Sequence, residues 1–172
     1  MSNDQTTQTD AVGAVSRAQA GKYLTFQLAE ETYGIEILRV QEIIQMVSVT
    51  SVPRTPPFVR GVINLRGKVI PVVDLRIKFE MAACEDTQTT CIIVVQLSSG
   101  STKVTTGVIV DAVAEVLDIS KDEIEPAPSF GTTVDTDFIL GVGNVRDKVV
   151  MLLDIDRVMS NEEVGALVQV DG

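Results

Sequence analysis

The chain carries two copies of one pattern of short apolar segments, and this duplication limits the fold more than any other feature. The segment FVRGVINLRGKVIPVVDL, residues 58–75, matches FILGVGNVRDKVVMLLDI, residues 138–155, at its Phe, Gly, Val, Asn, Arg, Lys and Asp positions. Likewise GIEILRVQEII, residues 34–44, matches GVIVDAVAEVL, residues 107–117. Both matches keep the same order, which predicts two similar units of about 70–80 residues. Units of that size bury little core alone, so we expect them to pack together.

The apolar segments have the length and alternation of strands. From Lys22 onward, Leu24, Phe26 and Leu28 recur at a period of two, which predicts a strand, a turn at 30–32 and a second strand. Further strands are expected at 43–49, 58–64, 68–73, 91–97, 103–110, 113–117, 138–144 and 148–153. Short strands joined by Gly, Pro, Ser and Asp favour all-β barrels over alternating βαβ units.

Few helices are expected. Residues 120–124, SKDEI, are typical of a single capped turn. Residues 154–169 are the best helix, because Ile155, Val158 and Met159 fall on one face.

The predicted domain organisation is one folded domain between two tails. Residues 1–20 are small and polar, which is typical of a disordered tail. A domain with two β-barrel subdomains is expected over 21–165, and a C-terminal tail over 166–172. The polar stretch 80–90 is the expected boundary between the barrels, although strands that cross from one barrel to the other would move it.

Composition narrows the partners and the compartment. Hydrophobic residues make up 45% of the chain and Trp is absent, so the core should be built from Val, Ile and Leu. A net charge of −10 makes nucleic acid an unsuitable partner. No apolar run predicts a signal peptide or a membrane-inserted helix. Cys84 and Cys91 are too few for a disulfide framework, and no histidine accompanies them, so we expect a reduced cytoplasmic protein without a metal site.

The chemistry of an enzyme is mostly missing. Without histidine the chain lacks the commonest general base and nucleophile activator. The GVG of residues 141–143 sits in a strand pattern with no following helix, so it predicts no dinucleotide site. Asp111 with Glu115, or the acidic run at 122–125, could act as paired carboxylates, but a solvated turn and strand edge is the simpler interpretation. A binding module without catalytic residues or cofactor is favoured, and a small-ligand-binding barrel or a carboxylate enzyme stays an alternative.

One arginine stands at the sharpest expected turn. Arg66 has a counterpart in Arg146, and each follows an asparagine by two residues, which is typical of turn chemistry. The next residue differs, because Gly67 supplies a flexible bend whereas Asp147 can neutralise its neighbour. The first turn is thus expected to have no carboxylate next to its arginine in the sequence. In the second turn, Arg146 is expected to form an ion pair with Asp147. Arg66 either closes the turn or contacts a partner.

These motifs together carry a family resemblance. The string FVRGVINLRGKVIPVVDLR, with YGIEILRVQEI before it and GVIVDAVAEVLDI and IEPAP after it, resembles the CheW family, the coupling proteins of bacterial chemotaxis. The resemblance runs from about residue 22 to 163. The same module forms the regulatory domain of the histidine kinase CheA and the front part of CheV proteins, so a CheV-like or kinase-derived fragment is a rival interpretation.

The resemblance implies a fold and a set of partners. The fold is all-β, with two packed five-stranded SH3-like barrels around a shared core and short helices that include a C-terminal one. The implied function is non-catalytic. The implied partners are the cytoplasmic hairpin of a methyl-accepting chemoreceptor and the regulatory domain of CheA. Contacts with CheA or other CheW-like modules close rings within the signalling array.

The resemblance also implies site residues. The receptor groove comprises Val40, Glu42, Gly61, Asn64, Arg66 and Gly67, and the kinase surface comprises Ile43, Cys91 and Ile92. Arg66 suits a bidentate contact with a receptor glutamate. Val40 and Ile43 suit apolar contact with a docked helix, and core packing is the alternative for Ile43. Gly61 and Gly67 either touch the receptor or only let the backbone bend.

Overall fold

The computed structural model describes residues 18–81, 85–127 and 137–171. Most of the expected N-terminal tail, residues 1–17, lies outside the described residues. The strands are β1 (Gly21–Leu28), β2 (Glu31–Glu36), β3 (Val40–Gln45), β4 (Val59–Leu65), β5 (Lys68–Asp74), β6 (Cys91–Ser99), β7 (Thr102–Val110), β8 (Ala112–Ile119), β9 (Ile124–Glu125), β10 (Ile139–Val145) and β11 (Lys148–Leu153). The helical segments are η2 (Ile37–Arg39), α2 (Leu75–Lys78), η3 (Lys121–Glu123) and α3 (Asn161–Asp171).

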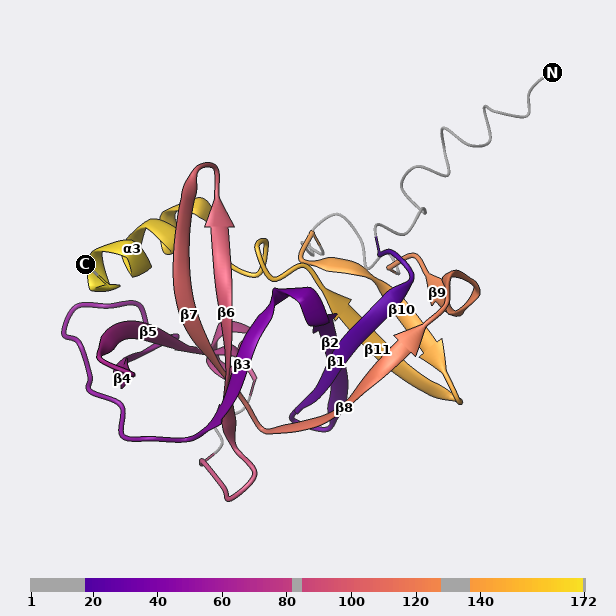
Figure 1. Cartoon of the computed structure of the whole chain (residues 1–172), viewed down its shortest axis with the longest axis horizontal. Coiled ribbons are helices and arrows are strands. Elements are labelled where there is room, and N and C mark those ends of the chain that lie inside the picture. Colours follow the sequence, from indigo (N-terminus) through magenta and orange to yellow (C-terminus); the bar gives the residue numbers. More distant parts are fainter. Residues whose placement is uncertain (1–17, 82–84, 128–136, 172) are drawn as a thin grey trace.

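The strands form two sheets that lie side by side (Figure 1). The six-stranded sheet has the order β8-β1-β2-β11-β10-β9 and is called the first barrel here; the second barrel has the order β3-β6-β7-β5-β4. Each sheet closes on itself. In the second barrel, Thr50 pairs with Val62 of β4 through two backbone hydrogen bonds, and in the first barrel β9 pairs with β10. The predicted pair of SH3-like barrels is confirmed, with β9 as an additional short strand.

The two sequence copies are interwoven. The first copy contributes β1 and β2 to the first barrel and β3, β4 and β5 to the second, whereas the second copy does the reverse. Parallel pairs join the copies, since β5 pairs with β7 and β11 pairs with β2. Between strands, the chain crosses from one barrel to the other at η2 and again at Asp111, between β7 and β8. After β11 it returns to the second barrel, where α3 packs against β5, β6 and β7. Residues 80–90 instead join α2 to β6, both in the second barrel.

The core is mostly aliphatic and has three parts. One apolar cluster is shared by both barrels; it includes Leu24, Phe26 and Ile35 from the first and Ile93 and Val95 from the second. Each barrel also has its own filled interior. The first is packed with Tyr23, Leu117, Ile119, Val145, Val150 and Leu152, and the second with Ile63, Ile70, Val72, Ile92, Val94 and Ile109. Aliphatic packing across the seam therefore holds the barrels together.

Most strands lie within two residues of their expected limits, but β3 does not. It spans Val40–Gln45 instead of 43–49. The later part of the expected strand leaves the sheet and leads to Thr50, whose pairing with β4 closes the barrel. The expected turn at 120–124 is present as η3, where Ser120 and Glu123 form a capping box.

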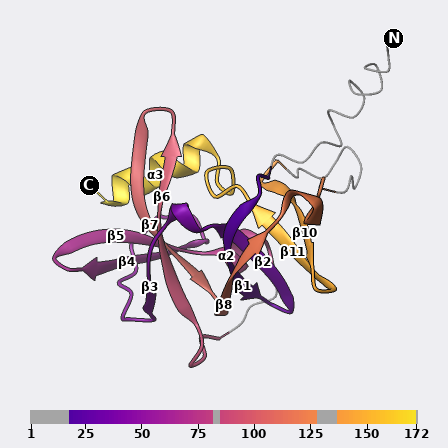
Figure 2. The ribbon, with the colours of Figure 1, turned by 45° about the vertical axis from the view of Figure 1, so that its right-hand side comes forward.

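The C-terminal helix begins later than the sequence analysis predicted. Ile155, Val158 and Met159 are buried, but they precede α3 rather than sharing its face. The Ser160 hydroxyl accepts a hydrogen bond from the Glu163 amide (3.1 Å), and the Glu163 carboxylate accepts one from the Ser160 amide (2.8 Å). This capping box starts the helix at Asn161. The helix contains residues 166–171, expected as a tail, and contacts β5, β6 and β7 (Figure 2).

Candidate functional site

The β4–β5 hairpin turns through two residues with positive φ. Arg66 has a φ of +51° and Gly67 a φ of +86°, the pattern of the tight turn that matches strand twist. The Asn64 side chain accepts a hydrogen bond from the Gly67 amide at 2.8 Å. Asn64 therefore closes the turn, and the Arg66 side chain is left free to point elsewhere.

Arg66 forms a bidentate ion pair with Glu42 of β3. Its Nη1 and Nη2 donate to the two carboxylate oxygens, each at 2.6 Å. The Arg66 side chain is still 69% exposed. The hydrogen bonds from Arg66 lower the pKa of Glu42, and in turn raise the pKa of Arg66. The residue next to Arg66 is a glycine, as expected, but barrel closure brings β3 beside the hairpin and supplies Glu42 as a carboxylate partner.

The second-copy turn also differs from expectation. Arg146 and Asp147 have φ values of +52° and +66°, so the backbone repeats the turn of the first copy. Among the residues that the structure describes, however, no ion pair joins Arg146 to Asp147. The predicted self-paired turn is therefore not found.

Gly61 is required by a close backbone approach. It has a φ of +145° at the bulge of β4, and a Cβ at this position would lie 2.0 Å from the Thr50 carbonyl oxygen. That contact closes the second barrel. Gly67 is different, because no atom lies within 4 Å of the position that its Cβ would take. Of the two roles left open for Gly61, the backbone role has direct geometric support.

The apolar residues of the predicted site divide by burial. Val40 is half-buried against the shared core, whereas the Ile43 side chain is 44% exposed, so Ile43 is not a core residue. Cys91 is half-buried, and this burial raises the pKa of its thiol. Ile92 is 0% exposed inside the second barrel. The expectation that Ile92 forms part of a binding surface is therefore corrected, since its side chain fills the barrel interior.

All nine predicted site residues lie on the second barrel. They are found on β3 (Val40, Glu42, Ile43), on β4 and its turn (Gly61, Asn64, Arg66, Gly67) and on β6 (Cys91, Ile92). Hydrogen bonds join Arg66 to Glu42 and Gly67 to Asn64.

Sequence reasoning missed one exposed apolar residue on the same hairpin. Val69 of β5 is exposed, although the sequence around it, VIPVV, has no polar alternation that would separate the two faces.

Other kinds of site find no support in the described ranges. No group of three His, Cys, Asp or Glu residues there is arranged to hold a metal ion. No helix in those ranges is long and apolar enough to cross a membrane. Both barrel interiors are filled by aliphatic side chains, which argues against the alternative of a ligand-binding barrel.

Comparison with known proteins gives a consistent picture. A family model described as CheW-like domain matches residues 22–163. The chemotaxis protein CheW of Klebsiella aerogenes is 40% identical over 83% of this chain and 84% of the relative. The chemotaxis protein CheW of Rhizobium meliloti is 34% identical over 81% of this chain and 88% of the relative. The crystal structure of the scaffolding protein TtCheW from Thermoanaerobacter tengcongensis superimposes with a TM-score of 0.73 at 38% identity, covering 84% of this chain and 96% of that one.

Proposed function

The chain belongs to the CheW-like family of chemotaxis proteins, and from that premise we propose that it is a non-catalytic adaptor between chemoreceptors and the histidine kinase CheA. It binds the cytoplasmic hairpin of a methyl-accepting receptor and the regulatory domain of CheA, and transmits receptor state to kinase activity. Ring contacts with CheA or other CheW-like modules place it in a signalling array. The adaptor works in the cytoplasm, without nucleic acid, cofactor or direct insertion into the membrane.

The Glu42–Arg66 pair is the observation that carries the proposed receptor surface. Glu42 uses two of the five N–H donors of Arg66 and leaves the others for a partner. The pair also fixes the guanidinium in one orientation, which lowers the entropy lost when a receptor carboxylate binds. Ile43, the next residue of β3, is exposed on the opposite face of the strand and is left to the proposed kinase surface. The surface around Arg66 therefore suits a helix that carries an acidic residue.

The proposed kinase surface is smaller than the sequence alone indicated. Ile43 and Cys91 remain in it, because both side chains are at least partly accessible. Ile92 contributes only by supporting β6 from inside the barrel. Glu42 and Ile43 point to opposite faces of β3, so the two partners would bind on either side of this strand.

The test is a binding experiment with a matched control. Wild type, Arg66→Glu and Arg146→Glu are each titrated with a purified receptor hairpin and separately with a CheA regulatory domain. Arg146 occupies the equivalent position in the turn between β10 and β11. Both variants therefore make the same change of charge at a residue with the same backbone conformation. We expect Arg66→Glu to lose receptor binding and keep kinase binding, and Arg146→Glu to keep both.

Two outcomes would contradict the proposal. If Arg66→Glu binds both partners as wild type does, the arginine only completes the hairpin and the receptor surface lies elsewhere. If wild type binds neither partner, the adaptor function itself fails.

A further inference from the structure

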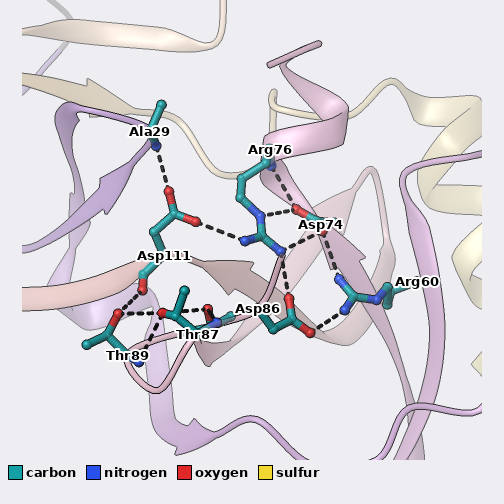
Figure 3. A network of polar contacts seen from close by, with 9 residues as sticks. Ala29, Arg60, Asp74, Arg76, Asp86, Thr87, Thr89 and Asp111 are labelled. Atoms are coloured by element: carbon teal, nitrogen blue, oxygen red, sulfur yellow. Dashed lines mark hydrogen bonds and ion pairs between the residues drawn. The ribbon is translucent and has the colours of Figure 1, made fainter. Parts of the chain in front are cut away.

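A buried arginine lies where the two barrels meet (Figure 3). Arg76 of α2 is 3% exposed. Its guanidinium donates to both oxygens of Asp74 (3.0 Å each), to Asp86 (3.0 Å) and to Asp111 (2.9 Å). The hydrogen bonds that Arg76 donates to Asp74 raise the pKa of Arg76, so its guanidinium stays protonated. A buried cation is tolerated only when it is well paired, so each of these carboxylates has a structural reason to be present.

Asp111 extends this network into the first barrel. It stands between β7 and β8, where the chain leaves the second barrel. One carboxylate oxygen accepts from Arg76, and the other accepts from the amide of Ala29 (2.6 Å), in the turn between β1 and β2. The Asp111 amide also donates to the carbonyl of Gln27 on β1 (3.0 Å). Arg76 and the β1–β2 hairpin are therefore joined through one carboxylate.

The other crossing point carries a comparable ion pair. Arg39, the last residue of η2, donates to both oxygens of Asp156 (3.0 and 2.7 Å) and to the carbonyl of Gln96 on β6 (2.7 Å). Asp156 follows β11 of the first barrel, and it also accepts from the amide of Ser98 on β6 (2.9 Å). The two crossings between strands, at η2 and at Asp111, thus each have a directional clamp of one arginine and one aspartate.

We propose that the Arg76–Asp111 and Arg39–Asp156 pairs are positioning devices that hold the two barrels in one relative orientation, and that coupling of receptor state to kinase activity depends on this orientation. The inference rests on the proposed adaptor function. The shared core is mostly aliphatic, with a run of aromatic contacts from Phe26 to Phe138, and the hydrophobic attraction that it supplies is non-directional. It favours contact between the barrels more strongly than it selects an angle. Charge-assisted hydrogen bonds have fixed geometry and supply the missing direction.

The experiment separates the clamps from the rest of the ion network. Asp111→Asn and Asp156→Asn each keep the size of the side chain and remove its charge. Asp86→Asn is the matched control, because Asp86 also binds Arg76 but its other ion-pair partner, Arg60, is on β4 of the same barrel. For each full-length variant, three quantities are measured: amide hydrogen exchange, affinity for each partner alone, and kinase activation with receptor and kinase together.

The inference predicts a specific combination of results. Exchange at the Ala29 amide rises in Asp111→Asn, and exchange at the Ser98 amide rises in Asp156→Asn. Affinity for each isolated partner stays at the wild-type value, while kinase activation falls several-fold. Asp86→Asn activates the kinase like wild type.

Three results would overturn the inference. The first is a clamp variant with faster exchange that activates the kinase fully. The second is unchanged exchange in both clamp variants. The third is a loss of kinase activation in Asp86→Asn as large as that in the clamp variants. That result would mean that the whole ion network around Arg76, and not the clamps, supports activation. Failure of the adaptor function looks different, because wild type itself would then leave kinase activity unchanged.

Discussion

Arg66 occupies a backbone conformation that disfavours an arginine. A positive φ of the left-handed kind costs a residue with a side chain roughly 1–2 kcal/mol, and glycine or asparagine would fit the turn better. Arg146 has the same conformation in the other hairpin, so the turn alone does not distinguish Arg66. What distinguishes Arg66 is its bidentate pair with Glu42 on an exposed surface. The sequence revealed the turn and the arginine, but it did not reveal Glu42 as the partner, because the two residues meet only through barrel closure.

At this scale, a charge exchange separates the internal pair from the proposed receptor contact. The double variant Glu42→Arg with Arg66→Glu keeps an ion pair between β3 and the turn, and it places a carboxylate where the receptor surface offers a cation. We expect it to fold like wild type and to lose receptor binding, as measured by thermal unfolding and by titration with the receptor hairpin. Recovery of binding by the exchanged pair would show that the pair matters only for the fold.

A second prediction at the residue scale concerns two glycines. Gly61→Ala should lower the free energy of unfolding by roughly 3 kcal/mol or more, because its Cβ would overlap the Thr50 carbonyl. Gly67→Ala, with open space around it, should cost only about 1 kcal/mol of backbone strain. Urea unfolding of both variants measures the difference. Equal losses would mean that the approach of Thr50 to β4 is not needed for stability.

At the scale of elements, the alternation of apolar and polar residues, together with turn residues, predicted most strands. A strand with one buried face shows this alternation in its sequence. β6 begins with CIIVVQL, where apolar and polar residues do not alternate. Its inward-facing residue Ile92 was therefore predicted to be on the surface. The start of α3 was missed because three buried apolar residues before it imitate helical spacing. The signal that would have found it is SNEE at 160–163, a capping box in the sequence.

The attachment of α3 should depend on pH. Burial raises the pKa of Glu163, but the hydrogen bonds from Lys78 on α2 and from Ser160 outweigh burial, and the pKa lies below its ordinary value of 4.5. A lowered pKa in the folded state means that the interaction stabilises the fold above about pH 4.5 and that this stabilisation is lost as the pH falls through the folded-state pKa.

Glu163→Gln tests this sign. Its deficit in unfolding free energy relative to wild type should be largest near neutral pH and should shrink below about pH 4.5, as followed by urea unfolding at a series of pH values. The exposed neighbour variant Glu162→Gln is the control and should show no such trend. A Glu163→Gln deficit that stays constant down to acid pH would show that the Lys78 contact is not the cause.

At the scale of the whole molecule, the repeat predicted two related units but not how they are assembled. Periodicity and turn residues describe each strand and its nearest neighbour in sequence. They contain no record of the parallel pairs β5–β7 and β11–β2, which depend on contacts between distant segments. The boundary expected at 80–90 separates the copies correctly, yet it falls within one barrel, because each copy gives strands to both.

This assembly predicts the behaviour of a divided chain. Two fragments that are separated between residues 80 and 90 should each remain unfolded alone, because neither contains all the strands of either sheet. Mixed or co-expressed, they should form one complex with the circular dichroism spectrum of the intact chain. Size-exclusion chromatography and circular dichroism measure both. A first fragment that folds by itself would show that its strands can pair within one copy.

The two crossing clamps have a consequence for ancestry. A single copy could close such barrels only by exchanging strands with an identical twin, so the present chain has the architecture of a homodimer fused into one polypeptide. The first copy carries arginine at both clamp positions, Arg39 and Arg76, and the second carries aspartate at both, Asp111 and Asp156. Two first copies would bring like charges together, as would two second copies. Repulsion between identical halves therefore directs each first copy to pair with a second copy and disfavours the pairing of like with like.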